Sequence, residues 1–436
     1  MKHLLTALLA IVWFNAWGSY TIVEGRLDNS DIYPGTVHRF RVSVPDSHDF
    51  STPAALYLGL DGILCNAPAV IDSLMQAGVV PPMVGVYLEP GYVPGDSIVL
   101  RYNRSNEFDA TDARFASFIE KELLPAVENL DLPDGRHIKL SPRGADHMIF
   151  GLSSGGIAAF NAAWHRPDLF SKVFSGCGTF VPMRGAHDLE AIVRKHEPLP
   201  LRIFLQDGYT DTWNPIFGSW YEHNRLLASA LEFAGYDCAF DWAEGGHSVR
   251  RASEIFPEVM TWLWREGEPA PGTTGNGLLA PMLDGAGDWN FDPVTVSAAP
   301  AGNPEAVYPD GSLVAVSVPG SNFIDQYLID AAGQRVNGQR YYWLHSYDNS
   351  DITPASMTFD GNGYLWVVTR AGIQICDQNG RVRGILRLPD GIIPSEASIT
   401  VSDGTVTLSS PAGSWTRRLA VKGAVPGERP RSEGPA

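Results

Sequence analysis

The segment "GLSSG" at Gly151–Gly155 is the part of the sequence whose residue types and spacing most directly suggest chemistry, because it carries the pattern G-x-S-x-G. It follows the apolar run "HMIF", typical of a buried strand, and leads into the small-residue run "GGIAAFNAAW", typical of a helix. A sharp strand-to-helix turn needs glycines on both sides of the serine and exposes that serine at the carboxyl end of a sheet. Ser153 is therefore the candidate nucleophile. Ser154 is the alternative nucleophile, and a purely structural turn serine is the other interpretation.

A base and an acid follow the serine along the chain in the order that such a sheet requires. A serine hydroxyl is a weak nucleophile unless an imidazole takes its proton and a carboxylate orients that imidazole. The loop "DGYTDTW" follows the strand-like run "LRIFLQ" and carries Asp207 and Asp211, and "GGHS" follows the run "CAFDWAE" and carries His247. His247 is therefore the candidate base. The competing histidines fall on a predicted strand or on predicted helices: His147, His165 and His223.

The choice of the acid depends on the positions of two aspartates in one loop. Asp207 directly follows the strand and precedes Gly208, where a carboxylate commonly accepts backbone N–H groups and fixes a turn. Asp211 lies farther out on the loop and has more reach toward His247. We therefore predict Asp211 as the acid and keep Asp207 as the alternative.

The elements that position these residues alternate between strand-like and helix-like segments from Thr36 to about Glu266. The strand-like runs are "TVHRFRVSV", "AALYLGL", "VGVYL", "HMIFG", "KVFSG", "LRIFLQ" and "CAFDWAE". The predicted helices are Ala69–Gly78, Asp112–Asn129, Gly156–His165, Tyr221–Gly235 and Ala252–Arg265. Short apolar strands that alternate with helices predict an α/β domain with a mainly parallel sheet covered on both faces.

The length, the charge and the N-terminal residues limit the classes of function. A chain of 436 residues allows two to three domains, and a net charge of −17 disfavours nucleic acid and anionic membrane surfaces as partners. A basic start, an apolar run over Leu4–Phe14 and the small residues Ala16 and Gly18 predict a signal peptide over residues 1–18. We therefore expect a secreted or periplasmic protein that does not insert into the membrane after cleavage. An uncleaved N-terminal anchor is the alternative.

The four cysteines give no sign of a metal site. They are scattered, with no C-x-x-C pair, so neither a zinc site nor a dense disulfide framework is indicated: Cys65, Cys177, Cys238 and Cys376. Cys177 and Cys238 lie in or beside apolar runs and are expected to pack as small core residues.

The last third of the chain differs in composition from the first part. We predict an α/β domain over residues 19–266, a linker over 267–277, a β-rich domain over 278–425 and a disordered tail over 426–436. In the β-rich part, three segments near Asp310, Asn362 and Asp403 each place a DG or NG turn before a short β-rich run. Their spacing of roughly forty to fifty residues is that of propeller blades. A partial propeller is therefore expected, with a small β-sandwich as the alternative.

Residues 20–266 resemble the α/β-hydrolase esterase family that includes esterase D, enterobactin-esterase-like and feruloyl- or acetyl-xylan-esterase-like enzymes. The segments that carry the resemblance are "LGLDG" at 58–62, "YNRSNEFDATDARFASFIEKELLPAVE" at 102–128, "GLSSGG" at 151–156, "DGYTD" at 207–211 and "GGH" at 245–247. The resemblance implies a nucleophile at Ser153, a base at His247 and an acid at Asp211. It also implies an oxyanion hole made by the backbone N–H of Ser154 and one more N–H near Gly62 or Ile63.

Residues 303–421 are similar to the last third of the gluconolactonase and regucalcin-like propeller family, mainly through "GYLWVVTRAGIQICDQNGRVRGIL". The chain is too short for six blades, and "PASM" at Pro354–Met357 stands where that family has an aspartate metal ligand. Glu305 resembles another ligand of the family, but one glutamate cannot build a divalent-cation site. The resemblance to this family is therefore not taken to imply lactonase activity for this chain.

Together these observations predict an exported serine esterase that hydrolyses carboxylic esters, with esters on carbohydrates as the expected substrates. The reaction would pass through an acyl-enzyme, and no cofactor is expected. Three alternatives remain: acyl transfer on the same core, a metal-dependent lactonase in the C-terminal part, and a non-catalytic carbohydrate-binding protein.

Overall fold

The computed structural model of the chain describes residues 19–196, 198–269, 289–293, 305–346 and 354–430. The predicted signal peptide and most of the predicted linker lie outside these residues. The chain divides into two compact units, which are described separately. The first is Met1–Arg194 with Pro198–Thr273, and the second is Lys195–Glu197 with Thr274–Ala436.

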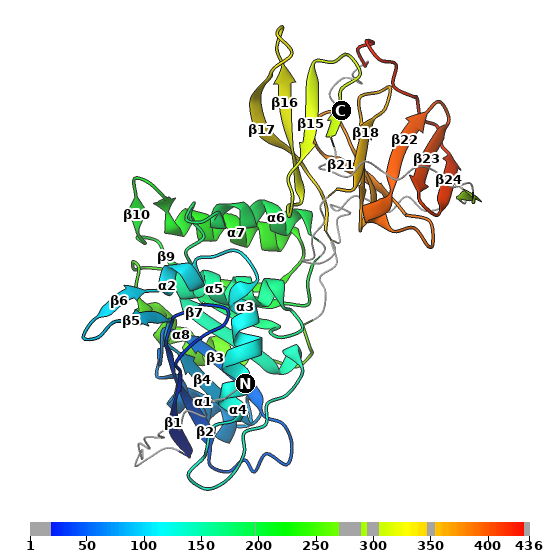
Figure 1. Cartoon of the computed structure of the whole chain (residues 1–436). Coiled ribbons are helices and arrows are strands. Elements are labelled where there is room, and N and C mark those ends of the chain that lie inside the picture. Colours follow the sequence, from blue (N-terminus) through cyan, green and yellow to red (C-terminus); the bar gives the residue numbers. More distant parts are fainter. Residues whose placement is uncertain (1–18, 197, 270–288, 294–304, 347–353, 431–436) are drawn as a thin grey trace. The chain divides into compact units, whose positions relative to one another are not determined.

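The first unit is built on a mixed sheet in the order β1-β2-β4-β3-β7-β8-β9-β12 (Figure 1). The pairs β1–β2 and β2–β4 are antiparallel, and every later pair is parallel. The strands are β1 (Tyr20–Leu27), β2 (His38–Pro45), β3 (Ala55–Leu60), β4 (Met83–Leu88), β7 (His147–Leu152), β8 (Lys172–Gly176), β9 (Arg202–Gly208) and β12 (Asp237–Ala243). Two hairpins lie outside this sheet, β5 (Tyr92–Pro94) with β6 (Val99–Tyr102) and β10 (Trp213–Asn214) with β11 (Gly218–Ser219).

The helices of this unit include those predicted, near their predicted bounds, and two short ones that were not predicted, Arg104–Phe108 and Leu189–Lys195. They are α1 (Ala67–Gln76), α2 (Arg104–Phe108), α3 (Arg114–Phe118), α4 (Leu124–Glu128), α5 (Ser154–His165), α6 (Leu189–Lys195), α7 (Trp220–Phe233) and α8 (Val249–Leu263). The single helix predicted over Asp112–Asn129 is two short helices joined by a π-helical turn over Ile119–Leu123. Pro125 lies in the first turn of α4 and has no N–H to donate, which accounts for the change of hydrogen-bonding pattern just before it.

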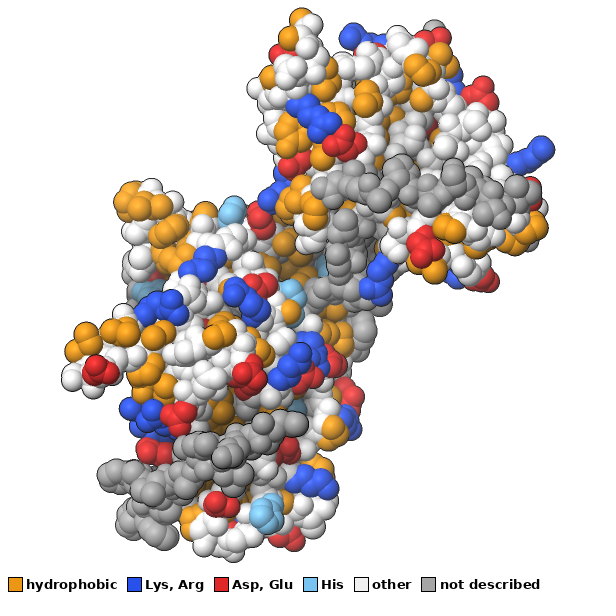
Figure 2. Space-filling view, viewed as in Figure 1, with side chains coloured by type: hydrophobic (Ala, Val, Ile, Leu, Met, Phe, Trp, Pro, Cys, Tyr) orange, Lys and Arg blue, Asp and Glu red, His pale blue; other side chains and the backbone are white. Residues whose placement is uncertain are grey.

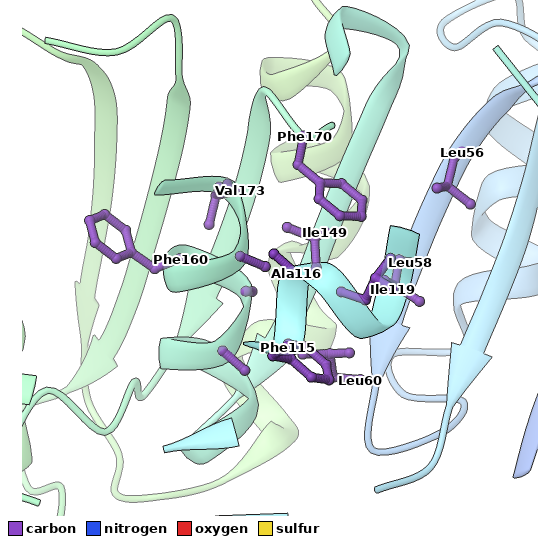
Figure 3. Packing of buried hydrophobic residues seen from close by; sticks show 14 of the residues in the cluster. Leu56, Leu58, Leu60, Phe115, Ala116, Ile119, Ile149, Phe160, Phe170 and Val173 are labelled. Atoms are coloured by element: carbon purple, nitrogen blue, oxygen red, sulfur yellow. The ribbon is translucent and has the colours of Figure 1, made fainter. Parts of the chain in front are cut away.

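The core of this unit lies on both faces of the sheet. Along β3, Leu56 and Leu58 belong to one apolar cluster and Tyr57 to the other. The first cluster includes residues of α3 and α5, and the second includes residues of α1 and α8. Figure 3 shows Leu58 beside Ile119 on the first face, and Leu56 and Ile149 belong to the same cluster. Strands covered on both faces need apolar side chains at every position, so they appear in the sequence as continuous apolar runs. The predicted α/β-hydrolase class is confirmed.

The described residues of the second unit form three four-stranded antiparallel sheets: β14-β15-β16-β17, β18-β19-β20-β21 and β13-β24-β23-β22. The strands are β13 (Asn290–Asp292), β14 (Glu305–Val307), β15 (Leu313–Ser317), β16 (Phe323–Ile329), β17 (Arg335–Trp343), β18 (Ser356–Phe359), β19 (Leu365–Thr369), β20 (Gly372–Cys376), β21 (Val382–Leu386), β22 (Ser398–Ser402), β23 (Thr405–Ser410) and β24 (Gly413–Arg418). Along β19, Val367 belongs to one apolar cluster and Trp366 to another, so the middle sheet is covered on both faces.

The three predicted DG and NG turns occupy equivalent places in these sheets. The turns at Asp310, Asn362 and Asp403 each connect an edge strand of a sheet to the strand beside it, β14 to β15, β18 to β19 and β22 to β23. Three sheets exceed the two of a β-sandwich, and four strands per sheet is the number in a propeller blade. The all-β class of this unit is confirmed, and its relation to a propeller stays a prediction.

Among the described residues, no helix is both long enough and apolar enough to cross a membrane.

Candidate active site

The turn that carries Ser153 has an unusual backbone conformation. Ser153 lies between β7 and α5 with φ 58° and ψ −122°, a combination that costs a residue with a side chain about 1–3 kcal/mol. The turn is held from the neighbouring segment, because Ser153 N–H donates to Gly176 O at 3.0 Å and Ser153 O accepts from Thr179 N–H at 3.1 Å. The chain therefore keeps a strained residue at the carboxyl end of a central strand.

Glycine is required around Ser153 because neighbouring atoms approach the backbone closely there. A Cβ atom on Gly151 would lie 2.2 Å from Gly155 O, and one on Gly156 would lie 2.6 Å from Ser175 Oγ. The start of α5 therefore packs directly on its neighbours, with no room for side chains. This is the steric demand that the G-x-S-x-G pattern predicts.

Asp211 and His247 are in direct contact. Asp211 Oδ1 accepts a hydrogen bond from His247 Nδ1 at 2.7 Å. The Asp211 side chain is fully buried, whereas the His247 side chain is 31% exposed to solvent. A carboxylate on Nδ1 places the proton there and leaves Nε2 as the basic nitrogen. His247 can therefore accept a proton at Nε2 from a group on the solvent side.

Within the described residues, Ser153 Oγ and His247 do not form a hydrogen bond. Ser153 Oγ lies 3.4 Å from Thr179 Oγ1. Catalytic hydrogen bonds are often long in unliganded enzymes and tighten when substrate binds. The structure thus joins Asp211 and His247 by a hydrogen bond, whereas the described hydrogen bond of Ser153 Oγ is with Thr179.

The loops that carry Asp211 and His247 are bonded to each other. Thr210 N–H and Thr210 Oγ1 both donate to Gly245 O, at 3.0 and 2.9 Å, and Tyr209 N–H donates to Ala243 O at 2.9 Å. A Cβ atom on Gly208 would lie 2.1 Å from Gly245 O, so this contact requires a glycine. The relative position of acid and base is therefore set by backbone contacts as well as by their own hydrogen bond.

The predicted oxyanion hole needs one correction. Gly62 N–H donates to Leu88 O at 2.9 Å, so it is not available to a substrate oxyanion. The chain turns sharply here, with φ 62° at Asp61 and φ 81° at Gly62, which directs the Gly62 N–H back toward β4. No hydrogen bond is described for Ser154 N–H or Ile63 N–H within the described part of the chain, and these two remain the candidate donors.

Arg104 is a residue of this region to which sequence reasoning assigned no role. Its Nε and one terminal nitrogen donate to the two carboxylate oxygens of Asp61 at 2.6 and 2.7 Å, and the same terminal nitrogen donates to Leu152 O at 3.3 Å. One guanidinium therefore connects the loop after β3 to the residue before Ser153. The signal in the sequence was the segment "YNRSNEF", which begins at Tyr102.

The helix that carries Arg104 is anchored by a buried carboxylate. Glu107 is fully buried and accepts from Gly91 N–H at 3.0 Å and from Asn103 Nδ2 at 2.6 Å, and it bonds His38 Nε2 at 3.0 Å. A carboxylate bonded by three groups in the interior gives α2 a fixed place.

Cys177 lies beside the candidate catalytic residues. Its Sγ, a carboxylate oxygen of Asp211 and a ring nitrogen of His247 all lie within 4.8 Å of one another. Burial, followed by the charge of Asp211, raises the pKa of the Cys177 thiol well above its usual range. A neutral thiol beside an occupied carboxylate–imidazole pair is a poor metal site. All four cysteines of the chain are free.

Both small hairpins of this unit carry exposed apolar side chains. The β5–β6 hairpin presents Ile98, Leu100 and Tyr102, and the β10–β11 hairpin, which follows Asp211 directly, presents Trp213 and Ile216. Figure 2 shows the hydrophobic side chains over the β5–β6 hairpin at the left of the view. Exposed apolar side chains grouped in this way are typical of binding surfaces.

The family of the chain follows from a comparison with known protein families. The model of the family described as "Putative esterase" matches residues 33–253, a segment that contains Ser153, Asp211 and His247. The chain belongs to this esterase family, and it is a hydrolase that acts on esters. A search of curated protein sequences found no match.

Several solved structures are similar to part of the chain. A ferulic acid esterase matches with 16% identity and a TM-score of 0.42, over 57% of this chain and 98% of that one. The enterobactin esterase of Shigella flexneri, in the presence of enterobactin, matches with 20% identity and a TM-score of 0.42, over 60% of each chain. The enterobactin and salmochelin hydrolase IroE matches with 19% identity and a TM-score of 0.40, over 57% and 96%. These values are too low to bear on the substrate or on individual residues.

Proposed function

We propose that the first unit hydrolyses carboxylic esters by a serine mechanism in which Ser153 is the nucleophile, His247 the base and Asp211 the orienting acid. The observation that carries this proposal is the 2.7 Å hydrogen bond between Asp211 Oδ1 and His247 Nδ1, on loops next to the strained Ser153 turn. Such an arrangement of serine, imidazole and buried carboxylate is what acyl transfer requires.

The reaction proceeds in two steps with the same groups. Ser153 Oγ attacks the ester carbon while His247 Nε2 takes the hydroxyl proton, and the oxyanion accepts hydrogen bonds from Ser154 N–H and Ile63 N–H. Collapse of the intermediate expels the alcohol, which receives the proton from His247, and leaves an acyl-enzyme on Ser153. Water then attacks the acyl group with His247 as base, which releases the acid and restores the serine.

Hydrolysis is favoured over acyl transfer by the exposure of the base. The His247 side chain keeps 31% of its exposure, so water reaches the imidazole that must activate it. An acyltransferase on this core would have to exclude water from the acyl-enzyme.

For the substrate, we propose an ester carried on a carbohydrate, with the apolar hairpins near Tyr102 and Trp213 in contact with it. We also propose that the protein acts after export, since residues 1–18 have the pattern of a signal peptide.

The experiment that tests the reaction is a hydrolysis screen combined with a covalent label. The panel contains p-nitrophenyl esters of increasing acyl length, methyl ferulate, acetylated xylan and siderophore trilactones. A serine hydrolase is expected to turn over members of this panel and to react stoichiometrically with a fluorophosphonate. Ester hydrolysis without labelling would contradict the serine mechanism and leave the reaction class intact.

Replacing Arg104 by glutamine is expected to lower kcat with little effect on KM. The bidentate pair with Asp61 would be lost, so the loop that carries Ile63 N–H would no longer be fixed to the Ser153 turn. The expected loss is at most 10²–10³, on the order of that for removing one oxyanion-hole donor. Arg104→Lys keeps the positive charge but lacks the planar guanidinium group, so its kcat should lie between those of the wild type and Arg104→Gln. Steady-state kinetics and thermal melts measure the effect.

The control for this prediction is Arg114→Gln, because the Arg114 guanidinium pairs with Asp112 on the exposed surface. This variant should behave as the wild type. A well-folded Arg104→Gln variant with unchanged kcat would show that the connection to Asp61 does not support catalysis.

Treatment with a chelator is expected to change neither the esterase activity nor the melting temperature. Glu305, the residue that resembles a ligand of the lactonase propellers, is held by both terminal nitrogens of Arg335 at 3.0 and 2.6 Å. A carboxylate engaged in this way is not free to bind a cation. Metal analysis of the purified protein checks the result, and one divalent ion per chain would favour the lactonase alternative.

A further inference from the structure

The carboxyl group of Asp207 is buried next to the carboxylate that bonds His247. Asp207 has no exposed surface, and its Oδ1 accepts from Gly208 N–H at 2.7 Å. Asp211 N–H donates to Gly208 O at 3.0 Å, which closes a tight turn between the two aspartates. This turn brings the second carboxyl group back toward the first at the end of β9.

One oxygen of each carboxyl group has no donor to accept from. Asp211 Oδ1 is bonded by His247 Nδ1 and Thr212 N–H, but Asp211 Oδ2 and Asp207 Oδ2 are both buried without a hydrogen-bond partner among the described residues. Two ionised carboxylates side by side in the interior would repel each other and leave both oxygens unsatisfied. A single proton between them satisfies both oxygens and removes one charge.

We propose that Asp207 is a protonated positioning residue, whose carboxylic acid donates a hydrogen bond to the Asp211 carboxylate and holds it against His247. The proton belongs on Asp207 because Asp211 already accepts from two other donors, which stabilise its ionised form. This role rests on the proposed function, in which Asp211 orients the catalytic imidazole.

The ionisation of the two groups agrees with this geometry. Burial, then the hydrogen bond and the charge of Asp211, raise the pKa of Asp207 to about 9. Burial alone would also raise the pKa of Asp211, but the hydrogen bonds from His247 and Asp207 lower it. The other titratable groups facing the pair are the neutral Cys177 thiol, at the end of β8, and His247, after β12. Asp207 is therefore neutral, and Asp211 charged, across the neutral pH range.

The first test compares pH profiles of kcat/KM. In the wild type, ionisation of Asp207 breaks its hydrogen bond to Asp211, so activity should fall as the pH rises through about 9. In Asp207→Asn, the amide keeps a donor for Asp211 and cannot ionise, so activity at neutral pH should stay close to the wild type and the alkaline fall should disappear. Asp207→Leu has no donor and should lose kcat by roughly ten- to hundredfold, the scale of a lost hydrogen bond to a charged group, with KM unchanged.

The matched control is Asp241→Asn on β12, because the Asp241 carboxylate pairs with Arg251 and has no described hydrogen bond with Asp207, Asp211 or His247. This variant should keep the alkaline fall. The same alkaline fall in Asp207→Asn and in the wild type would overturn the proposal, as would a fully active Asp207→Leu variant that folds normally.

The second test needs no activity, so it separates this proposal from the proposed function. It measures the free energy of unfolding against pH in the Ser153→Ala background. Folding raises the pKa of Asp207 from about 4 in the unfolded chain to about 9. Between these two pH values the folded chain therefore binds one proton more than the unfolded chain. Stability should therefore decline as the pH rises across this window.

The Asp207→Asn substitution should remove this part of the decline, and Asp241→Asn should keep it. If the decline disappears with Asp207→Asn but no ester is ever hydrolysed, the shared proton stands and the proposed function fails. If the decline is unaffected by Asp207→Asn, the shared proton is disproved, whatever the enzyme hydrolyses.

Discussion

The Ser153→Ala variant is expected to lose nearly all turnover while its melting temperature stays close to that of the wild type. Without the hydroxyl no acyl-enzyme forms, and the loss for a serine hydrolase is on the order of 10⁶ in kcat. The fold should persist, because the hydroxyl makes only a 3.4 Å contact with Thr179 Oγ1. Kinetics on the best ester of the panel, together with a thermal melt, measure both quantities.

The labelling experiment identifies the nucleophile independently. A fluorophosphonate should modify Ser153 in the wild type and nothing in Ser153→Ala. Persistent labelling of Ser154 in that variant, with activity intact, would show that the neighbouring serine is the nucleophile. A control with Ser253→Ala should behave as the wild type, since this hydroxyl bonds Val249 O within α8.

The second large effect is expected for Asp211→Asn, which should lower turnover by about 10⁴ with the fold retained. Asparagine presents an N–H to His247 Nδ1, where the carboxylate accepted one at 2.7 Å, so the imidazole is held in the wrong tautomer. Because the pKa of Asp211 is lowered, the wild-type carboxylate stays ionised at neutral pH and accepts a hydrogen bond from His247 Nδ1–H. Kinetics and thermal melts on the purified variant check the prediction.

Asp207→Asn is the matched variant for this experiment. Asp207 lies at the end of β9 and Asp211 in the turn that follows it, both are buried, and only Asp211 bonds the imidazole. Asp207→Asn should remain active. If it is instead the inactive and well-folded variant, Asp207 is the acid and Asp211 is not.

The fold of the first unit could be predicted because its strands are covered on both faces. Residues such as Leu56, Tyr57 and Leu58 must all be apolar whichever face they meet, so each strand is visible as a run. The turn at Ser153 was visible for a related reason. Its glycines are fixed by contacts as short as 2.2 Å, and such contacts limit the residue types strictly.

The remaining parts of the site could not be predicted, because they depend on backbone directions and on contacts between distant segments. Whether Gly62 or Ile63 offers its N–H depends on the positive φ angles at Asp61 and Gly62, which the residue types alone do not fix. Arg104 meets Asp61 across 43 residues of chain, and either residue alone is an ordinary surface charge in the sequence.

The acid pair shows a further limit. Asp207 was predicted to fix a turn, and its Oδ1 does accept from Gly208 N–H. Its second oxygen is buried without a hydrogen-bond partner among the described residues, and this has no signature in the sequence, because burial of a loop aspartate depends on the packing of distant segments.

The strained backbone at Ser153 means that selection for stability and selection for catalysis act in opposite directions at this position. Glycine would adopt φ 58° and ψ −122° without the penalty of a side chain, so replacing the proposed nucleophile by glycine would relieve this strain. Selection for stability alone would therefore replace this serine by glycine. On the proposed mechanism, the strained conformation is retained because the hydroxyl of Ser153 is needed for the reaction.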